Sequence, residues 1–465
     1  MKPSLCVYGH FYQPPRDDPF TGVIAPEYGA APYPNFNEKI TAECYRPNAE
    51  AGNFERISFN LGPTLAEWLE RAHPDVNARI LAADRAHMAQ HGVGNALAQV
   101  YNHTILPLAN HRDKQVQIEW GLADFARRFG RRAEGMWLAE TAVDMETLDL
   151  LAQRGVRYTV LAPWQSAQPI DATQPYFVRL AGGRAITIFF FNGPVSGLIS
   201  FDGAATADAG AFAASSLPLQ INQAKASGGE PQLIVLASDG ELYGHHKPWR
   251  DQFLKYLLTR SAPALGFEVT TLGRYLRDHP ATAEVTLRVP SAWSCAHGMA
   301  RWATGCSCTP GDSSWKSALR HAFDQLGEQV DELFVRALRP FLDDPWAARQ
   351  DYLAYRSGLL SAETFWERHR AGGAARGARS AAARTDLLLA AEYYAQRMYT
   401  SCGFYGEDLD GIESRNNIAF ARRAIGLVRQ ATGEDHRPRF LRDLVAARSW
   451  RTGLSGLDLY RQLPS

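Results

Sequence analysis

The chain has 465 residues, enough for two or three domains, and its hydrophobic fraction of 46% is enough for a large buried core. Lys plus Arg and Asp plus Glu are balanced at 49 each, so the charge favours neither nucleic acid nor an anionic membrane as a partner. No run of about 18 apolar residues could span a membrane, and residues 1–15 lack the features of a signal peptide. Six scattered cysteines give no disulfide framework, which makes the reducing cytoplasm the expected compartment.

Short apolar runs alternate with amphipathic stretches through the first part of the chain. The runs are residues 4–9, 56–60, 96–101, 134–139, 157–162, 185–191, 232–238 and 267–271. Their near-continuous hydrophobicity is typical of parallel strands that are covered on both faces. Helical patterns such as residues 64–73, 114–130 and 144–155 lie between them. This alternation predicts an α/β fold of the β/α-barrel type.

Polar and aromatic side chains follow the predicted strands at the points where the strands end. They are His10, Asn60, Asn102, His103, Glu140, Trp164, Asn192, Asp239 and Glu241. In a β/α barrel these ends converge on one rim, where active sites lie. Each polar residue could simply begin a loop, but carboxylates, histidines and tryptophans together on one rim favour a functional site.

The pattern becomes helical from about residue 290 onward. Apolar residues recur at helical spacing at Trp315, Leu319, Phe323, Leu326, Val330 and Leu333. Two further helical stretches cover residues 385–399 and 416–430. The sequence therefore predicts a helical C-terminal domain that packs on the barrel.

Glu140 and Asp239 are the carboxylates best placed to act as a pair, because each directly follows a predicted strand. Retaining glycoside hydrolysis uses two carboxyl groups roughly 5–5.5 Å apart, one as nucleophile and one as acid/base. Their environments must differ so that only one of them is ionised. Trp137 and apolar neighbours precede Glu140, whereas residues 238–246 place Glu241, His245 and His246 near Asp239.

Other interpretations of these residues stay open. Glu140 could be a helix-start carboxylate, and Asp239 could belong to an Asp-Gly turn. A zinc site could use the histidines together with the two acids of the Asp239 loop, the ligands then being His10, His103, His245, His246, Asp239 and Glu241. Cys295, Cys306 and Cys308 lack a CxxC pair, so we expect free thiols there rather than structural zinc. The tryptophans of the site could be core residues or sugar platforms.

Five segments occur in an order that resembles the five motif regions of glycoside hydrolase family 57. They are HFYQPP (10–15), NALAQVYNHTILPL (95–108), GMWLAE (135–140), ASDGELYGHH (237–246) and SAWSCAHGMARWATGCSC (291–308). Residues 399–413 resemble a C-terminal segment of one subgroup. The resemblance implies a retaining mechanism on α-glucans. It also implies an incomplete (β/α)7 barrel over residues 1–285, followed by an α-helical domain over 286–465 that contributes to the cleft.

The resemblance also implies roles for individual residues. Glu140 matches the family's nucleophile and Asp239 its acid/base. The matching positions for substrate binding are His10, His103, Trp137, Glu241, Trp293, Arg301 and Trp302. We add Tyr12, Gln13 and His245 from the same segments, and Trp164 from the end of the predicted strand 157–162. Tyr12 stands where the family often has a second histidine, and its hydroxyl can bind a sugar but does not titrate near neutrality.

The expected function is therefore hydrolysis of α-1,4 bonds in starch or glycogen, with α-1,6 bonds as a second linkage, as in α-amylases and amylopullulanases. We expect no metal and no cofactor in this reaction. The alternatives are a 4-α-glucanotransferase or glucan branching enzyme, a catalytically idle glucan-binding protein, and a metal-dependent barrel hydrolase. We also expect Trp302→Ala and Arg301→Ala to weaken catalysis more than stability.

Overall fold

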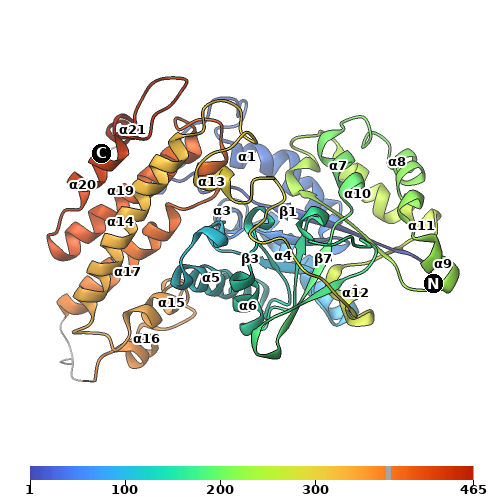
Figure 1. Ribbon diagram of the computed structural model, residues 1–465, viewed down its shortest axis with the longest axis horizontal. Helices are drawn as coiled ribbons and strands as arrows, with labels where there is room; N and C mark the ends of the chain where they lie inside the picture. Colours follow the sequence, from blue (N-terminus) through green and yellow to red (C-terminus); the bar gives the residue numbers. More distant parts are fainter. Residues whose placement is uncertain (373–378, 464–465) are drawn as a thin grey trace. The chain divides into compact units, whose positions relative to one another are not determined.

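The structure, a computed structural model, describes residues 1–372 and 379–463. These residues form two units (Figure 1). The first unit consists of Met1–Gln13, Ala25–Gln99 and Phe125–Trp293, and the second of Pro14–Ile24, Val100–Asp124 and Ser294–Ser465. Two segments from the N-terminal part of the chain thus belong to the second unit, which a single boundary near residue 286 does not anticipate.

All strands of the described residues lie in the first unit. They are β1 (Ser4–Phe11), β2 (Ser58–Leu61), β3 (Ala96–Gln99), β4 (Met136–Trp137), β5 (Tyr158–Leu161), β6 (Tyr176–Arg179), β7 (Ala185–Phe190), β8 (Leu233–Asp239), β9 (Glu268–Val269) and β10 (Ala283–Glu284). Each of the eight predicted apolar runs overlaps one of these strands, so the predicted α/β alternation is confirmed. The short strands β6 and β10 were not anticipated.

The strands form two sheets. The first has the order β4-β3-β2-β1-β8, with β9 also pairing with β1, and all of its pairs are parallel. The second has the order β10-β6-β7-β5, in which β6 is antiparallel to β7. Only two of the four β6 residues are buried, so this strand lacks the continuous apolar run that marks the parallel strands.

The two sheets share contacts at both ends and a single core. Gly135 forms a parallel bridge with Tyr158, and the N–H of Asn192 donates to the carbonyl of Val235 at 2.7 Å. One apolar cluster contains side chains from six strands, from the residues that directly follow β5 and β7, and from α12. Its members are Cys6, Tyr8, Leu97, Trp137, Tyr158, Val160, Ala162, Phe189, Phe191, Leu233, Val235, Ala237, Leu272, Tyr275 and Leu276. This interior fixes the orientation of the strand ends that carry polar residues.

Helices lie on more than one side of these strands (Figure 1). They are α1 (Phe36–Ile40), α2 (Arg46–Glu50), α3 (Pro63–Ala72), α4 (Pro74–His91), α6 (Met145–Gln153), α7 (Gly193–Phe201), α8 (Ala209–Ser216), α9 (Gln223–Gly228), α10 (Arg250–Tyr256), α11 (Ala262–Ala264) and α12 (Leu272–Asp278). α4 shows how local sequence sets the bounds. Pro74 occupies its first turn, where no N–H is needed, and Gly92 ends it with a φ of 72°.

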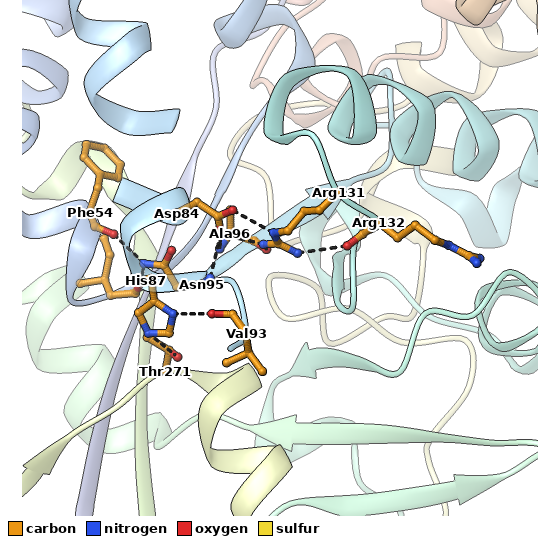
Figure 2. A network of polar contacts seen from close by, with 10 residues as sticks. Phe54, Asp84, His87, Val93, Asn95, Ala96, Arg131, Arg132 and Thr271 are labelled. Atoms are coloured by element: carbon orange, nitrogen blue, oxygen red, sulfur yellow. Dashed lines mark hydrogen bonds and ion pairs between the residues drawn. The ribbon is translucent and has the colours of Figure 1, made fainter. Parts of the chain in front are cut away.

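A buried polar network holds the N-terminal end of β3 (Figure 2). Asp84 of α4 accepts hydrogen bonds from the backbone N–H groups of Asn95 and Ala96 at 2.8 and 2.9 Å. Its carboxylate also accepts two bonds from the guanidinium of Arg131, at 2.8 and 2.7 Å. His87 bonds to the carbonyl of Val93 at 2.7 Å from the next turn of α4. The end of the strand opposite to the polar rim is thus fixed by hydrogen bonds.

We expect Asp84→Ala to lower the free energy of unfolding by about 3–5 kcal/mol, because it leaves a largely buried guanidinium without its carboxylate. Urea denaturation followed by tryptophan fluorescence would measure this loss. Glu284→Ala is the matched control, because it removes the exposed partner of Arg179 and should leave the free energy of unfolding nearly unchanged. Equal losses in the two variants would contradict the importance of the network.

The second unit is helical. It contains most of α5 (His111–Phe129), together with α13 (Ala300–Ala303), α14 (Trp315–Leu338), α15 (Pro345–Arg356), α16 (Ala362–His369), α17 (Arg379–Arg397), α18 (Cys402–Tyr405), α19 (Ile412–Thr432), α20 (Arg437–Leu444) and α21 (Gly456–Gln462). α17 packs against both α14 and α19. The predicted apolar stripe of α14 is confirmed, since all six of its residues are buried. No helix within the described ranges has the length and hydropathy to cross a membrane.

A buried ion cluster explains why α5 belongs with these helices. The fully buried guanidinium of Arg349 donates to Glu392 of α17 and to Asp113 of α5, both at 2.9 Å. The indole N–H of Trp120, also in α5, donates to the carbonyl of Arg349 at 3.1 Å. Three helices are therefore joined through one arginine.

Candidate active site

Parallel pairing brings three of the predicted rim residues into one row. His10 at the end of β1 is in register with Asn60 of β2 on one side and with Asp239 of β8 on the other. The Nδ1 atom of His10 lies 3.0 Å from Oδ1 of Asn60. The other end of the Asn60 amide donates to Oε1 of Gln99 at 2.7 Å, which carries the row on to β3. The expected convergence of strand ends is therefore present at β1, β2 and β8.

His10 is held as a neutral imidazole. Burial lowers its pKa to about 4, although the Asn60 contact works against this shift. Because Oδ1 of Asn60 can only accept, the proton of His10 is on Nδ1 and its Nε2 atom is an acceptor. Such a nitrogen can accept a hydrogen bond from a hydroxyl group at neutral pH.

Trp137 stacks on the ring of His10. The two rings stack with centroids 4.9 Å apart, and Trp137 also stacks on Tyr8 at 4.8 Å. Trp137 is fully buried, so it presents no exposed surface to a ligand. In this structure its ring packs between those of His10 and Tyr8.

Glu140 occupies a strained backbone position three residues after the end of β4. Its φ and ψ of 57° and 21° are left-handed, and the next residue, Thr141, also has a positive φ of 50°. Such conformations cost about 1–3 kcal/mol each at non-glycine residues and cluster at functional sites. The indole N–H of Trp293 donates to Oε2 of Glu140 at 2.9 Å, and its backbone N–H donates to the carbonyl of Glu140 at 3.1 Å. Trp293 therefore holds both the backbone and the carboxylate of Glu140.

Asp239 has a higher pKa than an ordinary carboxyl group. Its side chain reaches solvent, yet dense surrounding protein and the negative charge of Glu140 raise its pKa to about 7. The electrostatic interaction identifies Glu140 as a neighbour of Asp239. Asp239 thus keeps its proton near neutrality because the ionised Glu140 disfavours a second negative charge beside it. This arrangement is the one expected of a general acid.

Glu241 is hydrogen-bonded to a residue of the first motif. Its Oε1 atom accepts from the hydroxyl of Tyr45 at 2.7 Å and from the backbone N–H of Tyr12 at 3.1 Å. Burial raises its pKa to about 8, against the effect of the Tyr45 bond, and the charge of Asp239 adds to the rise. Gln13 donates to the Tyr45 hydroxyl at 3.1 Å. Tyr12 and Gln13 thus act on Glu241, through a backbone group and through Tyr45.

Sequence reasoning missed Tyr45. Tyr45 is the last residue of a short helical segment, Thr41–Tyr45, that carries no motif. Nothing in the sequence therefore marks its contact with Glu241, almost 200 positions further along the chain. His245, in contrast, was predicted to bind substrate and bonds through Nδ1 to Glu43 in the same segment at 2.6 Å. His10 therefore bonds to Asn60 of β2, whereas His245 bonds to Glu43 of the helical segment Thr41–Tyr45.

Trp164 offers the most exposed aromatic surface among the predicted residues. It follows β5, has 52% of its surface exposed, and packs edge-on against Phe191 at 5.7 Å. Trp293 is partly buried and contacts Trp137 edge-on at 5.1 Å. Trp164 therefore presents more of its surface to a ligand than the partly buried Trp293 or the fully buried Trp137.

The remaining predicted residues belong to the second unit. His103 is buried, with Nδ1 2.6 Å from the hydroxyl of Ser401. The guanidinium of Arg301 lies over the ring of Tyr405 at 3.7 Å. Trp302 is fully buried, so the expectation that Trp302→Ala spares stability needs correction, because emptying such a site costs about 3–5 kcal/mol.

We expect Trp293→Phe to lower kcat/KM by about 10–100-fold, since a hydrogen bond to a charged group contributes about 1.5–3 kcal/mol. The phenyl ring keeps most of the packing but cannot donate to Glu140. Steady-state kinetics would measure the loss. Trp68→Phe is the control, because it makes the same change in α3, where Trp68 contacts His73. An unchanged rate in Trp293→Phe would show that this bond does not position Glu140.

Two family models match this chain. A family model described as glycosyl hydrolase family 57 matches residues 28–288, and a second model, a domain of unknown function (DUF3536), matches residues 312–463. A 4-alpha-glucanotransferase of Thermococcus litoralis is 27% identical over 172 residues, which is 35% of this chain and 25% of that protein. An alpha-amylase of Pyrococcus horikoshii is 24% identical over 150 residues, which is 31% of this chain and 23% of that one. The chain thus spans about a quarter of the length of these curated relatives.

Solved structures share the fold over most of the chain. An exo-type maltose-forming amylase of Pyrococcus sp. ST04 superposes with a TM-score of 0.76 at 15% identity, covering 96% of this chain and 83% of that one. A branching enzyme of Thermococcus kodakaraensis gives a TM-score of 0.61 at 15% identity, with 99% and 96% covered. At such identities the likeness concerns the fold alone.

Proposed function

Because the chain belongs to glycosyl hydrolase family 57, we propose that it is a retaining glycosidase that cleaves α-1,4 bonds of starch- or glycogen-type glucans. The observation that carries the proposal is the pair formed by Asp239 and Glu140, in which the charge of one helps to raise the pKa of the other to about 7. Two interacting carboxyl groups in different protonation states are what this chemistry requires.

The proposed reaction has two steps. The Glu140 carboxylate attacks the anomeric carbon while the Asp239 carboxyl group gives its proton to the departing glycosidic oxygen, which yields a covalent glycosyl ester. Asp239 then removes a proton from an incoming water molecule, whose oxygen attacks the same carbon and releases Glu140. The two inversions leave the product with the configuration of the substrate. The Trp293 N–H stabilises the Glu140 carboxylate as it leaves.

We propose that the acceptor Nε2 of His10 binds a sugar hydroxyl beside Asp239, its neighbour in register. Glu241, whose pKa is about 8, is protonated near neutrality and would support Asp239 without adding a negative charge. Trp164 supplies an aromatic face for a further sugar ring. These roles account for the polar residues and the exposed aromatic ring at the strand ends.

The proposed framework is an incomplete (β/α)7 barrel of β1, β2, β3, β4, β5, β7 and β8. The bridge between Gly135 and Tyr158 and the bond from Asn192 to Val235 support it, since they connect the strands at both junctions of the two sheets. A helical domain from about residue 286 that contributes to substrate binding, and a cytoplasmic location, belong to the same proposal.

Transfer of the glucosyl group to another sugar is the second candidate, because one relative is a 4-alpha-glucanotransferase. Incubation with maltoheptaose followed by chromatography of the products separates the two. Hydrolysis gives only chains shorter than the substrate and new reducing ends, whereas transfer also gives longer chains, and branching gives α-1,6 signals in proton NMR. Failure to convert maltoheptaose, amylose or glycogen would overturn the proposed function, with Glu140→Gln protein as the blank.

A further inference from the structure

Four metal-ligand side chains meet in the segment between Trp293 and α14, within the second unit. Cys295, His297, Cys306 and Cys308 each offer one ligand atom, and these atoms all lie within 4.8 Å of one another. The sulfurs of Cys295 and Cys306 are 3.7 Å apart, and the sulfur of Cys308 is 3.4 Å from Nδ1 of His297. Within residues 1–372 and 379–463 this is the one group of its kind.

These distances are those of a tetrahedral zinc site. With Zn–S bonds of about 2.3 Å and Zn–N bonds of about 2.0–2.1 Å, tetrahedral angles place two sulfurs about 3.8 Å apart and a sulfur and a nitrogen about 3.5 Å apart. Both observed separations agree with these values. A disulfide would instead require the sulfurs at about 2.05 Å. The geometry thus matches ligands around an ion rather than a bonded pair of cysteines.

The charges around the cluster point the same way. Lys316 is fully buried in the first turn of α14, where its ammonium donates to the hydroxyl of Thr309 at 3.1 Å. It interacts electrostatically with Cys295 and Cys306, and Arg301 is a second cation near it. A buried ammonium is costly unless negative charge lies nearby. Three thiolates, one neutral imidazole and Zn²⁺ would carry a net charge of minus one, whereas four neutral side chains provide none.

We propose that Cys295, His297, Cys306 and Cys308 bind a structural Zn²⁺ ion. Thiolate and imidazole ligands in tetrahedral geometry favour zinc over Mg²⁺ or Ca²⁺, and four protein ligands leave no open position for catalysis. The sequence alone predicts free thiols here, because these cysteines lack the usual CxxC spacing. Folding brings the two pairs together from either side of α13.

The ion would act as a cross-link in a segment that has little regular structure. Between Ser294 and Trp315 the sole helix is α13, which has four residues. One ligand pair precedes α13 and the other follows it, so the ion would close a loop around Arg301 and Trp302. Such a clamp would hold the buried indole of Trp302 and the guanidinium that lies over Tyr405.

Metal analysis of the purified full chain tests the proposal. Protein prepared in reducing buffer without a metal-affinity step should contain about one zinc ion per chain, as measured by inductively coupled plasma mass spectrometry. Cys306→Ser and Cys308→Ser should each contain less than about a tenth of this amount. Cys402→Ser, a control in the same unit and outside the cluster, should retain it all. Circular dichroism shows whether each variant is folded.

A second measurement uses only the wild-type chain, so that it does not depend on the folding of variants. After chelation of the zinc under reducing conditions, added Co²⁺ should give the d–d absorption of tetrahedral cobalt and a thiolate-to-cobalt charge-transfer band. Reduced wild-type protein that holds no zinc and gives no such spectrum would overturn the proposal. Equal zinc contents in Cys306→Ser and wild type, or a Cys295–Cys306 disulfide in freshly prepared protein, would also overturn it. None of these readouts depends on glucan cleavage.

Discussion

Glu140→Gln is expected to lower kcat on maltoheptaose by about 10³-fold or more, with the fold intact. The amide has nearly the shape of the carboxylate and can still accept the N–H of Trp293, but it cannot form the glycosyl ester. Steady-state kinetics and thermal unfolding would measure the two effects. Glu146→Gln is the matched control, because it makes the same chemical change at an exposed position in the first turn of α6 and should leave kcat unchanged.

Rescue by azide distinguishes a nucleophile from a residue that only positions the substrate. In Glu140→Ala the small anion can enter the space of the lost carboxylate and attack the anomeric carbon directly. A single inversion of an α-glucoside then gives a β-glucosyl azide. Glu140→Gln protein that keeps tens of per cent of the wild-type rate, or an α-azide from Glu140→Ala, would show that another group is the nucleophile.

The row formed by Asn60, His10 and Asp239 could be predicted from the sequence for a simple reason. Each residue ends an apolar run, and parallel strands place their C-terminal ends on one edge. The identity of the strands follows from near-continuous hydrophobicity, which is a local property. Any site that is built only from strand ends is accessible to this argument.

The parts of the site that depend on loops could not be predicted in this way. Trp293 reaches Glu140 from 153 positions further along the chain, and Tyr45 reaches Glu241 from a helix without a motif. The left-handed backbone at Glu140 has no sequence signal, since the residue is not glycine. Loop geometry also decides that Cys306 approaches Cys295, which is why the spacing alone suggested free thiols.

The assignment of Asp239 as the general acid makes a prediction about pH. Its pKa of about 7 implies that kcat/KM for the wild type falls as the pH rises through about 7, because the group must carry a proton when the first step begins. Asp239→Asn should lose this alkaline limb and lower kcat on maltoheptaose by about 10²–10⁴-fold. A full pH profile of both proteins would measure this difference. A substrate with an acidic phenol as leaving group needs no proton, so its cleavage to the glycosyl ester should be affected far less.

The raised pKa of Asp239 also predicts how the free energy of unfolding depends on pH. The pKa of this carboxyl group is raised on folding, so the stability it contributes is fully present below its unfolded pKa of about 4 and is lost as the pH rises through about 7. Asp239→Asn removes the ionisation, and its melting temperature should therefore exceed that of the wild type at pH 8, with a difference that disappears toward pH 4. A variant that is more stable yet nearly inactive at pH 8 indicates that the carboxyl group is retained for chemistry rather than for folding. If instead Asp239→Asn keeps the alkaline limb on maltoheptaose, the titrating acid is another residue, and Glu241, with its pKa of about 8, is the next one to replace.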